Sequence, residues 1–168
     1  DGESPLHLSC RRGYLNVVKA LIENNAHLNI KKNNNRETPL HLACSNGYVD
    51  VVKYLIEKGA DMNAKDSKKN TPLHLSCEKN YIDVFKLLIK KNADFNLKNS
   101  DGRTPLHLAC NYHYIDIVKL LIKHNADLNI KNSKENTPLH RACFDGYIDI
   151  VKLLIKKNAD FNLKNSDG

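Results

Sequence analysis

Apolar and polar positions between residues 99 and 129 follow two helical patterns. Leu106, Ala109 and Cys110 recur at the spacing of one helix face. A second helix is predicted over residues 115–124, with a polar side of Asp116, Lys119 and Lys123 and an apolar side of Ile117, Val118, Leu120, Leu121 and Ile122. The pattern therefore predicts a pair of short helices that each bury one face.

Turn-forming residues separate such helix pairs. Residues 99–103 read Asn-Ser-Asp-Gly-Arg and predict a tight, hairpin-like finger. Thr104 should cap the first helix through its hydroxyl, and Pro105 suits the first helical position, where no N–H is needed. Asn125 is expected to end the second helix, because asparagine tolerates the left-handed conformation common at helix ends.

The whole arrangement repeats along the chain. A Ser/Thr-Pro-Leu-His motif begins at positions 4, 38, 71, 104 and 137, so the spacings are 34, 33, 33 and 33 residues. A fixed period of this length is typical of stacked repeat arrays, in which each unit packs only against its neighbours. A single repeat domain is predicted, with five repeats at approximately 1–34, 35–67, 68–100, 101–133 and 134–166.

The motifs of each repeat closely resemble the ankyrin repeat. In that family Thr-Pro-Leu-His-x-Ala follows a turn, and Gly-Ala-Asp-x-Asn follows the second helix. Residues 59–63 match the second motif completely, and residues 92–96 read Asn-Ala-Asp-Phe-Asn. The resemblance covers the whole chain. It implies an all-α solenoid of helix–turn–helix units with β-hairpin-like fingers, and partner proteins that bind the concave groove and the fingers.

Departures from the repeat pattern lead to local expectations. One inserted residue between Lys32 and Glu37 should make the first finger bulge. His113 stands where other repeats have Gly or Asn, so its backbone should be strained. Residues 86–102 are identical to residues 152–168, which indicates a duplicated two-repeat block. Neither end resembles a polar cap, so the repeats are expected to belong to a longer array, and end-to-end self-stacking is an open alternative.

Composition limits the class of protein. No apolar run approaches the roughly 18 residues that a membrane-spanning helix needs, so membrane insertion is not predicted.

The cysteines occupy one equivalent position in every repeat: Cys10, Cys44, Cys77, Cys110 and Cys143. Stacked helices lie roughly 8–10 Å apart, whereas a disulfide needs Cα atoms within about 7 Å. Free, buried thiols are therefore predicted, which favours the cytoplasm, with the nucleus as the alternative.

Each repeat also places a histidine and a cysteine on one helix face, as with His107 and Cys110. A zinc site or a Cys–His nucleophile would use these residue types, but each helix offers only two ligands and no third orienting group. Five identical copies indicate a structural role, and the resemblance implies a hydrogen bond from this histidine to the backbone of a neighbouring unit. No catalytic residue, metal site, cofactor or small-molecule substrate is predicted.

Positive charge raises the question of an anionic partner, because the formal net charge is +7. The four internal fingers carry ten basic and four acidic residues, and the outer side of the second helices carries eleven lysines and six acids. The charge is therefore dispersed over two faces, as on an ordinary solvated surface. Direct nucleic-acid binding is disfavoured.

Positions that differ between repeats mark candidate partner-binding residues, because core positions must repeat whereas groove positions are free to vary. Tyr112, Arg141 and Phe144 are residue types that often anchor interfaces. Local packing of Tyr112 and Phe144 against the next repeat is the competing interpretation. The predicted set also includes Asn111, Asp145, Lys79, Arg11, Arg12, Arg36, Lys68, Lys69, Arg103 and Lys134.

The sequence thus predicts a non-catalytic protein–protein interaction module. An acidic segment or helix of a partner would lie along the groove, with the finger lysines steering it. One alternative is a structural spacer or spring in a larger repeat protein. A second is a weak binder of anionic polymers, whose affinity would fall steeply as salt rises.

Overall fold

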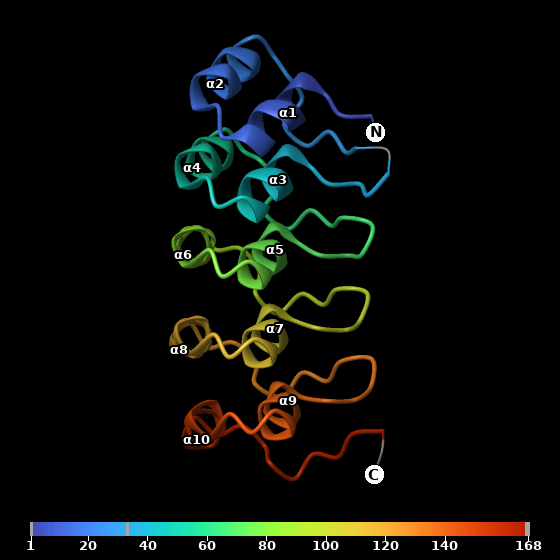
Figure 1. Ribbon diagram of the computed structural model, residues 1–168, viewed down its shortest axis with the longest axis vertical. Helices are drawn as coiled ribbons and strands as arrows, with labels where there is room; N and C mark the ends of the chain where they lie inside the picture. Colours follow the sequence, from blue (N-terminus) through green and yellow to red (C-terminus); the bar gives the residue numbers. More distant parts are fainter. Residues whose placement is uncertain (1, 33, 167–168) are drawn as a thin grey trace. The chain divides into compact units, whose positions relative to one another are not determined.

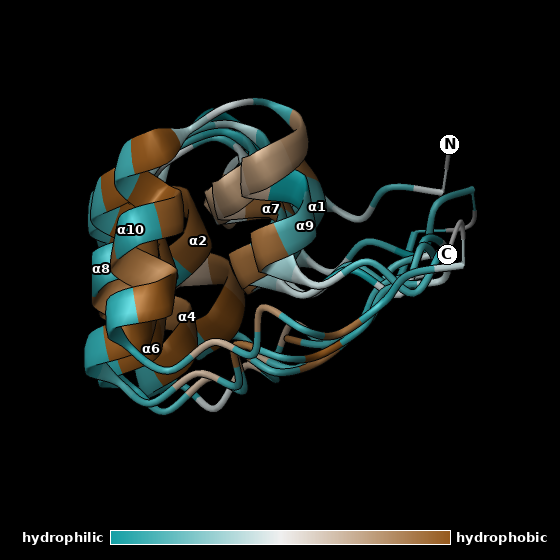
Figure 2. Ribbon diagram, turned by 90° about the horizontal axis from the view of Figure 1, so that it is seen from below, coloured by the Kyte–Doolittle hydropathy of each residue, from teal (hydrophilic) through white to brown (hydrophobic). Residues whose placement is uncertain are grey.

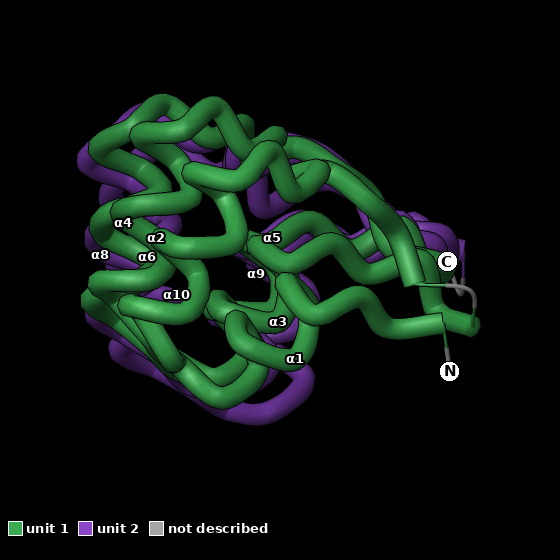
Figure 3. The backbone as a smooth tube through the Cα atoms, turned by 90° about the horizontal axis from the view of Figure 1, so that it is seen from above, with its two compact units in different colours: residues 1–94 green, residues 95–168 purple. Residues whose placement is uncertain are grey.

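The computed structural model describes residues 2–32 and 34–166 and consists of short α-helices joined by turns and fingers (Figure 1). The chain divides into two compact units, Asp1–Asp94 and Phe95–Gly168 (Figure 3). The first unit contains α1 (Pro5–Arg12), α2 (Leu15–Glu23), α3 (Pro39–Ser45), α4 (Val49–Glu57), α5 (Pro72–Glu78) and α6 (Ile82–Lys90). The second contains α7 (Pro105–Asn111), α8 (Ile115–Lys123), α9 (Pro138–Phe144) and α10 (Ile148–Lys156). The predicted all-α fold of paired helices is confirmed.

Every first helix begins with the same reciprocal cap. In α3, the Thr38 backbone N–H donates to Nδ1 of His41 at 3.2 Å, and the His41 N–H lies 3.4 Å from the Thr38 hydroxyl. Thr104 and His107 form the equivalent capping box in α7, so the predicted cap is confirmed. The box satisfies backbone donors that a helix start otherwise leaves without a partner.

The same histidines join successive repeats. The Nε2 of His41 lies 3.0 Å from the carbonyl oxygen of Asn70, and Nε2 of His107 lies 3.0 Å from that of Asn136. A carbonyl oxygen only accepts, so Nε2 carries the proton and Nδ1 accepts from the cap. The structural role expected for this histidine is therefore confirmed in both units.

The Ala-Asp-x-Asn motif forms a second ladder between repeats. The backbone N–H of Asp94 donates to Oδ1 of Asn63 at 3.0 Å in the first unit. In the second unit, the N–H of Asp160 donates to Oδ1 of Asn129 at 2.9 Å. Asn29, Asn63, Asn96 and Asn129 thus each accept from the backbone of the following repeat, which accounts for the recurrence of this residue.

The core of each unit lies between the first and second helices of its repeats. Ile117, Val118 and Leu121 of α8 are buried as predicted, whereas Leu120 and Ile122 are only half-buried, at the border of the apolar face. Hydrophobic residues are concentrated in the helices, and the fingers are mostly hydrophilic (Figure 2).

The first finger is wider than its neighbours, as the inserted residue predicts. In the second finger, the Asp66 N–H donates to the carbonyl of Asn70, four residues later. In the first, the Lys32 N–H donates to the carbonyl of Glu37, five residues later, so the same closing bond spans one more residue. Asn33, inside this finger, lies outside the described residues.

His113 adopts the left-handed backbone conformation that its position in the turn predicts, with φ of 58°. Two contacts offset the cost of this conformation. Its ring stacks on Tyr147 with centroids 4.2 Å apart, and its Nε2 lies 2.8 and 2.9 Å from the carboxylate oxygens of Asp149. A histidine therefore replaces the usual glycine while adding a hydrogen bond to the next repeat.

All five cysteines are free thiols, as predicted. Four are buried, and burial raises the pKa of Cys10 to about 12, so that thiol stays protonated. The prediction of a buried residue is wrong for Cys143, which is exposed because the described residues include no repeat beyond α9 and α10 to cover it.

Candidate protein-interaction surface

A groove of about 300 Å³ lies beside α7, α9 and their fingers in the second unit. Ten residues line it: Arg103, His107, Asn111, Asn132, Lys134, Asn136, His140, Arg141, Phe144 and Asn165. Five members of the predicted partner-binding set are thereby brought together: Arg103, Asn111, Lys134, Arg141 and Phe144. We call this surface the α7–α9 groove.

Phe144 and Arg141 form the most distinctive part of the groove. They lie three residues apart on α9 and so share a helix face. The Phe144 side chain is 82% exposed; the interpretation in which it packs against the next repeat stays untested, because no repeat beyond α9 and α10 is among the described residues. The Arg141 guanidinium carbon lies 5.2 Å from the centre of the Phe144 ring, and its Nε lies 2.7 Å from an Asp145 carboxylate oxygen. These contacts hold the guanidinium beside an exposed aromatic ring.

Tyr112 is separate from this cluster. It is 41% exposed at the end of α7, and its ring lies 5.6 Å from that of Tyr114. Tyr112 does not line the α7–α9 groove. The three anchors predicted together are therefore divided, with Arg141 and Phe144 in the groove and Tyr112 outside it.

The groove carries positive charge at neutral pH. Arg103, Lys134 and Arg141 line it, and no acidic side chain is among its lining residues. Burial lowers the pKa of His107 to about 4, so this histidine is neutral and contributes shape and hydrogen bonds, not charge. Asp145 lies beside Arg141, and Asp101 approaches Arg103 only to 3.9 Å. The surface suits a ligand with carboxylates and an apolar group.

Sequence reasoning missed half of the groove lining, including His140 and three asparagines. Asn165 donates from Nδ2 to Oδ1 of Asn136 at 2.8 Å, so the fingers of two repeats jointly form one wall. Asn132 accepts the N–H of Lys134 at 2.9 Å and shapes the turn that presents this lysine. These residues recur at equivalent positions of other repeats, as His140 does in every repeat, so a search for positions that differ between repeats passes over them.

The model of the ankyrin repeats family matches residues 1–66, 32–99 and 73–165, which together span nearly all of the chain. The chain belongs to the ankyrin repeat family. Ankyrin repeats are non-catalytic and typically serve as protein–protein interaction modules, so the prediction that the chain is not an enzyme is confirmed. No curated protein matches the chain.

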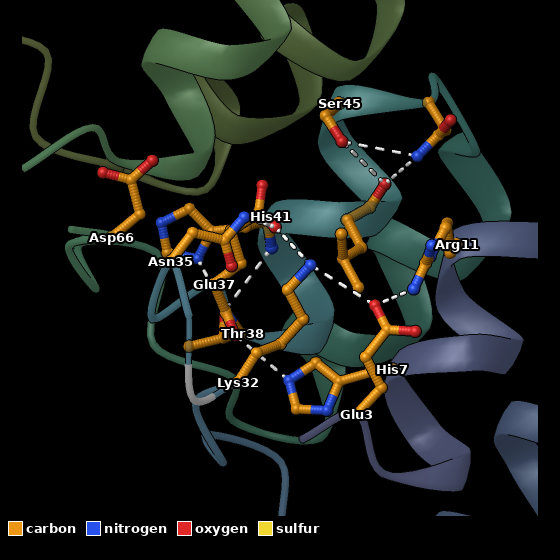
Figure 4. Close-up of polar contacts among 12 residues, drawn as sticks. Glu3, His7, Arg11, Lys32, Asn35, Glu37, Thr38, His41, Ser45 and Asp66 are labelled. Atoms are coloured by element: carbon orange, nitrogen blue, oxygen red, sulfur yellow. Dashed lines mark hydrogen bonds and ion pairs between the residues drawn. The ribbon is translucent and has the colours of Figure 1, made fainter. Parts of the chain in front are cut away.

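Arg11 is committed to a contact within its own ankyrin unit. Its guanidinium pairs with Glu3, which also lies 3.3 Å from Nζ of Lys32 (Figure 4). Lys32 in turn lies 2.8 Å from a carboxylate oxygen of Glu37. Because these charges neutralise one another, Arg11 offers a partner less charge than its sequence position predicts. The other predicted residues of this unit are exposed: Arg12, Arg36, Lys68, Lys69 and Lys79.

Within residues 2–32 and 34–166, no group of three or more His, Cys, Asp or Glu side chains is placed to hold a metal ion. Over the same residues, every helix is too short or too polar to traverse a bilayer.

Proposed function

We propose that the second ankyrin unit binds an acidic segment of a partner protein in the α7–α9 groove. The observation that carries this proposal is the cluster of Arg103, Lys134 and Arg141 around an exposed Phe144, in a groove that no acidic side chain lines. Residues of the partner that carry carboxylates would meet the cations, and one apolar side chain would cover the phenyl ring.

The strength of such an interface depends on two contacts. Covering a phenylalanine side chain contributes roughly 1.5–3 kcal/mol. A carboxylate can accept two N–H donors from one guanidinium, and the contacts of Arg141 with Phe144 and Asp145 reduce the side-chain freedom lost on binding. Arg141 and Phe144 are therefore the expected hot spots, with Arg103 and Lys134 adding attraction and orientation.

The proposal is tested by selecting binders from a random peptide library on the full chain and measuring their affinities by fluorescence anisotropy. Selected peptides should be rich in Asp and Glu. Arg141→Ala and Phe144→Ala should each weaken binding at least about tenfold, which is about 1.4 kcal/mol. Lys152→Ala, an exposed change on α10 outside the groove, is the matched control and should leave affinity unchanged.

Three results would contradict the proposal. The first is a set of binders without acidic enrichment, and the second is equal affinity for the groove variants and the control. The third is binding of simple polyanions as tight as that of the peptides, collapsing with salt, which would favour the anionic-polymer alternative. If no binder is obtained at all, the spacer hypothesis gains support.

A further inference from the structure

A second hollow of the second unit lies between α8 and α10, the helices that are farther from the fingers (Figure 1). Its volume is about 640 Å³, and it shares no lining residue with the α7–α9 groove. Its walls come from two consecutive repeats. Eight residues line it: Lys119, Ile122, Lys123, Asn125, Ala126, Leu128, Leu153 and Lys157. We call it the α8–α10 hollow.

The lining of this hollow combines cations with apolar surface. Its three lysines are exposed, and its larger aliphatic side chains are half-buried: Ile122, Leu128 and Leu153. No acidic side chain is among the lining residues. Asp116, on the surface of α8, lies 3.6 Å from Nζ of Lys119 and offsets part of one lysine charge. The hollow therefore suits a group that is both apolar and anionic.

The first unit contains an equivalent arrangement in which an aromatic ring is present. Every lining residue of the hollow has an equivalent in the first two repeats, and Leu153 corresponds to Tyr54 of α4. The Nζ atoms of Lys19 and Lys58 lie over the Tyr54 ring, 5.7 and 5.4 Å from its centre. The Tyr54 hydroxyl oxygen is buried, so the ring lies against the protein. A cation over an aromatic face is attracted by the negative charge of that face. We call these three residues the Tyr54 site.

The α8–α10 hollow keeps the two cations of the Tyr54 site and lacks its ring. Lys119 occupies the position of Lys19 in its repeat. Lys157 likewise occupies the position of Lys58. Because Leu153 is aliphatic, it does not supply the ring that a tyrosine supplies in the first unit. A ring from another molecule would meet the same pair of cations in the hollow.

A third lysine changes the charge of ligand that the hollow favours. Lys123 corresponds to Glu23 in the first repeat. Two lysines and one carboxylate thus surround the neutral phenol of the Tyr54 site, whereas the α8–α10 hollow has three lysines. The additional positive charge favours a ring with an anionic substituent. Phosphotyrosine combines a phenyl ring with a charge of about −1.5 to −2 and three strong acceptor oxygens.

We propose that the α8–α10 hollow binds a phosphotyrosine side chain of a partner protein. The ring takes the place that Tyr54 fills in the first unit, and the lysines donate to the phosphate oxygens. This inference does not rest on the proposed function, because the two surfaces share no residue.

The test measures the affinities of three short peptides for the full chain by titration followed by ¹H–¹⁵N NMR. The peptides carry phosphotyrosine, tyrosine or phosphoserine at the centre of the same uncharged sequence. The phosphotyrosine peptide should bind at least about tenfold more tightly than either of the others, because it alone carries both the ring and the dianion. The backbone signals of Lys123 and Asn125 should shift on binding.

Two substitutions close the hollow with residues that the chain already uses at equivalent positions. Leu153→Tyr supplies the ring of the Tyr54 site, and it should weaken binding of the phosphotyrosine peptide at least about tenfold. Lys123→Glu restores the charge of the first repeat and should also weaken binding at least about tenfold. Lys156→Glu makes the same charge change at an exposed position of α10 outside the hollow. It is the matched control and should leave the affinity close to that of the wild-type chain.

The converse variant builds the site in the first unit. Tyr54→Leu together with Glu23→Lys reproduces the leucine and the third lysine of the α8–α10 hollow. Leucine stands at the position of Tyr54 in α6, α8 and α10, so the helix accommodates it. The double variant should bind a second phosphotyrosine peptide, with new shifts in the first unit. Unchanged circular dichroism would verify that each variant folds.

Several results would overturn the proposal. Equal affinity for the phosphotyrosine and phosphoserine peptides would show that charge alone acts, and equal affinity for the tyrosine peptide would show that the phosphate contributes nothing. Absence of binding at millimolar phosphotyrosine peptide, or undiminished binding by Leu153→Tyr, would exclude the hollow. Loss of binding in Arg141→Ala would place the peptide in the α7–α9 groove instead. Because Leu153→Tyr leaves that groove intact, failure of this proposal and failure of the proposed function are distinguishable.

Discussion

Acid should destabilise this protein through the histidines of its helix caps, and His107 is the best site for testing this. Its Nδ1 accepts the backbone N–H of Thr104 at 3.2 Å, and its Nε2–H donates to the carbonyl of Asn136 at 3.0 Å. Only the neutral ring makes both bonds at once, because Nδ1 can accept a hydrogen bond only while it carries no proton. Protonation of Nδ1 would leave the Thr104 N–H without its acceptor, and the His107 side chain is only 2% exposed, so water cannot replace that acceptor.

The magnitude follows from the difference in pKa between the folded and unfolded chain. Burial lowers the pKa of His107 from 6.5 to about 4 in the folded state. The unfolded chain therefore takes up a proton first, so this contribution to stability is complete above pH 6.5 and is lost as pH falls toward 4. At 1.36 kcal/mol per unit, the free energy of unfolding should drop by about 2 kcal/mol between about pH 7.5 and about pH 5 from this residue alone. Burial shifts the pKa of His7 and His41 downward as well, which adds to the loss.

Urea denaturation followed by far-UV circular dichroism at the two pH values measures this loss. His107→Gln keeps a side-chain acceptor at a position where glutamine is common in capping boxes, and it does not titrate. The variant should lose about 2 kcal/mol less than the wild-type chain on acidification. His27→Gln, at an exposed histidine, is the control and should behave as wild type. An unchanged pH dependence in His107→Gln would refute the reasoning.

Two further predictions concern the turns between helices. The hydrogen bond from His113 is the main cause of the lowered pKa of Asp149. His113→Asn keeps a residue that tolerates the left-handed backbone but removes the imidazole, so it should raise the pKa of Asp149 toward its ordinary value. NMR titration of the Asp149 carboxyl carbon measures this change. Gly47→Ala should destabilise the chain by about 1–3 kcal/mol in urea, because φ is 78° and the new Cβ would lie 2.8 Å from the Tyr81 ring. Gly59→Ala shares the positive φ but has no heavy atom within 4 Å, so a loss equal to that of Gly47→Ala would show that the ring contact contributes nothing.

Local features of this fold followed from the sequence because they depend on residues close together in the chain. Thr104, Pro105 and His107 lie within one helical turn, so their capping role can be inferred without knowing the rest of the molecule. The positive φ at His113 followed similarly, since glycine or asparagine fills the equivalent turn in the other repeats. Repetition strengthened each inference, because five copies of one pattern have one explanation.

The composition of the surfaces was decided by the tertiary structure. Arg103, Lys134 and Asn165 are separated by about one repeat each, and only stacking of the fingers places them along one groove. Phe144 is exposed, and Arg11 is paired with Glu3. Periodicity specifies which side chains face the neighbouring helix, whereas exposure and charge pairing depend on atoms that distant segments bring within a few ångströms. For this reason the repeat pattern alone determined the architecture, and the three-dimensional structure determined which side chains lie exposed together on one surface.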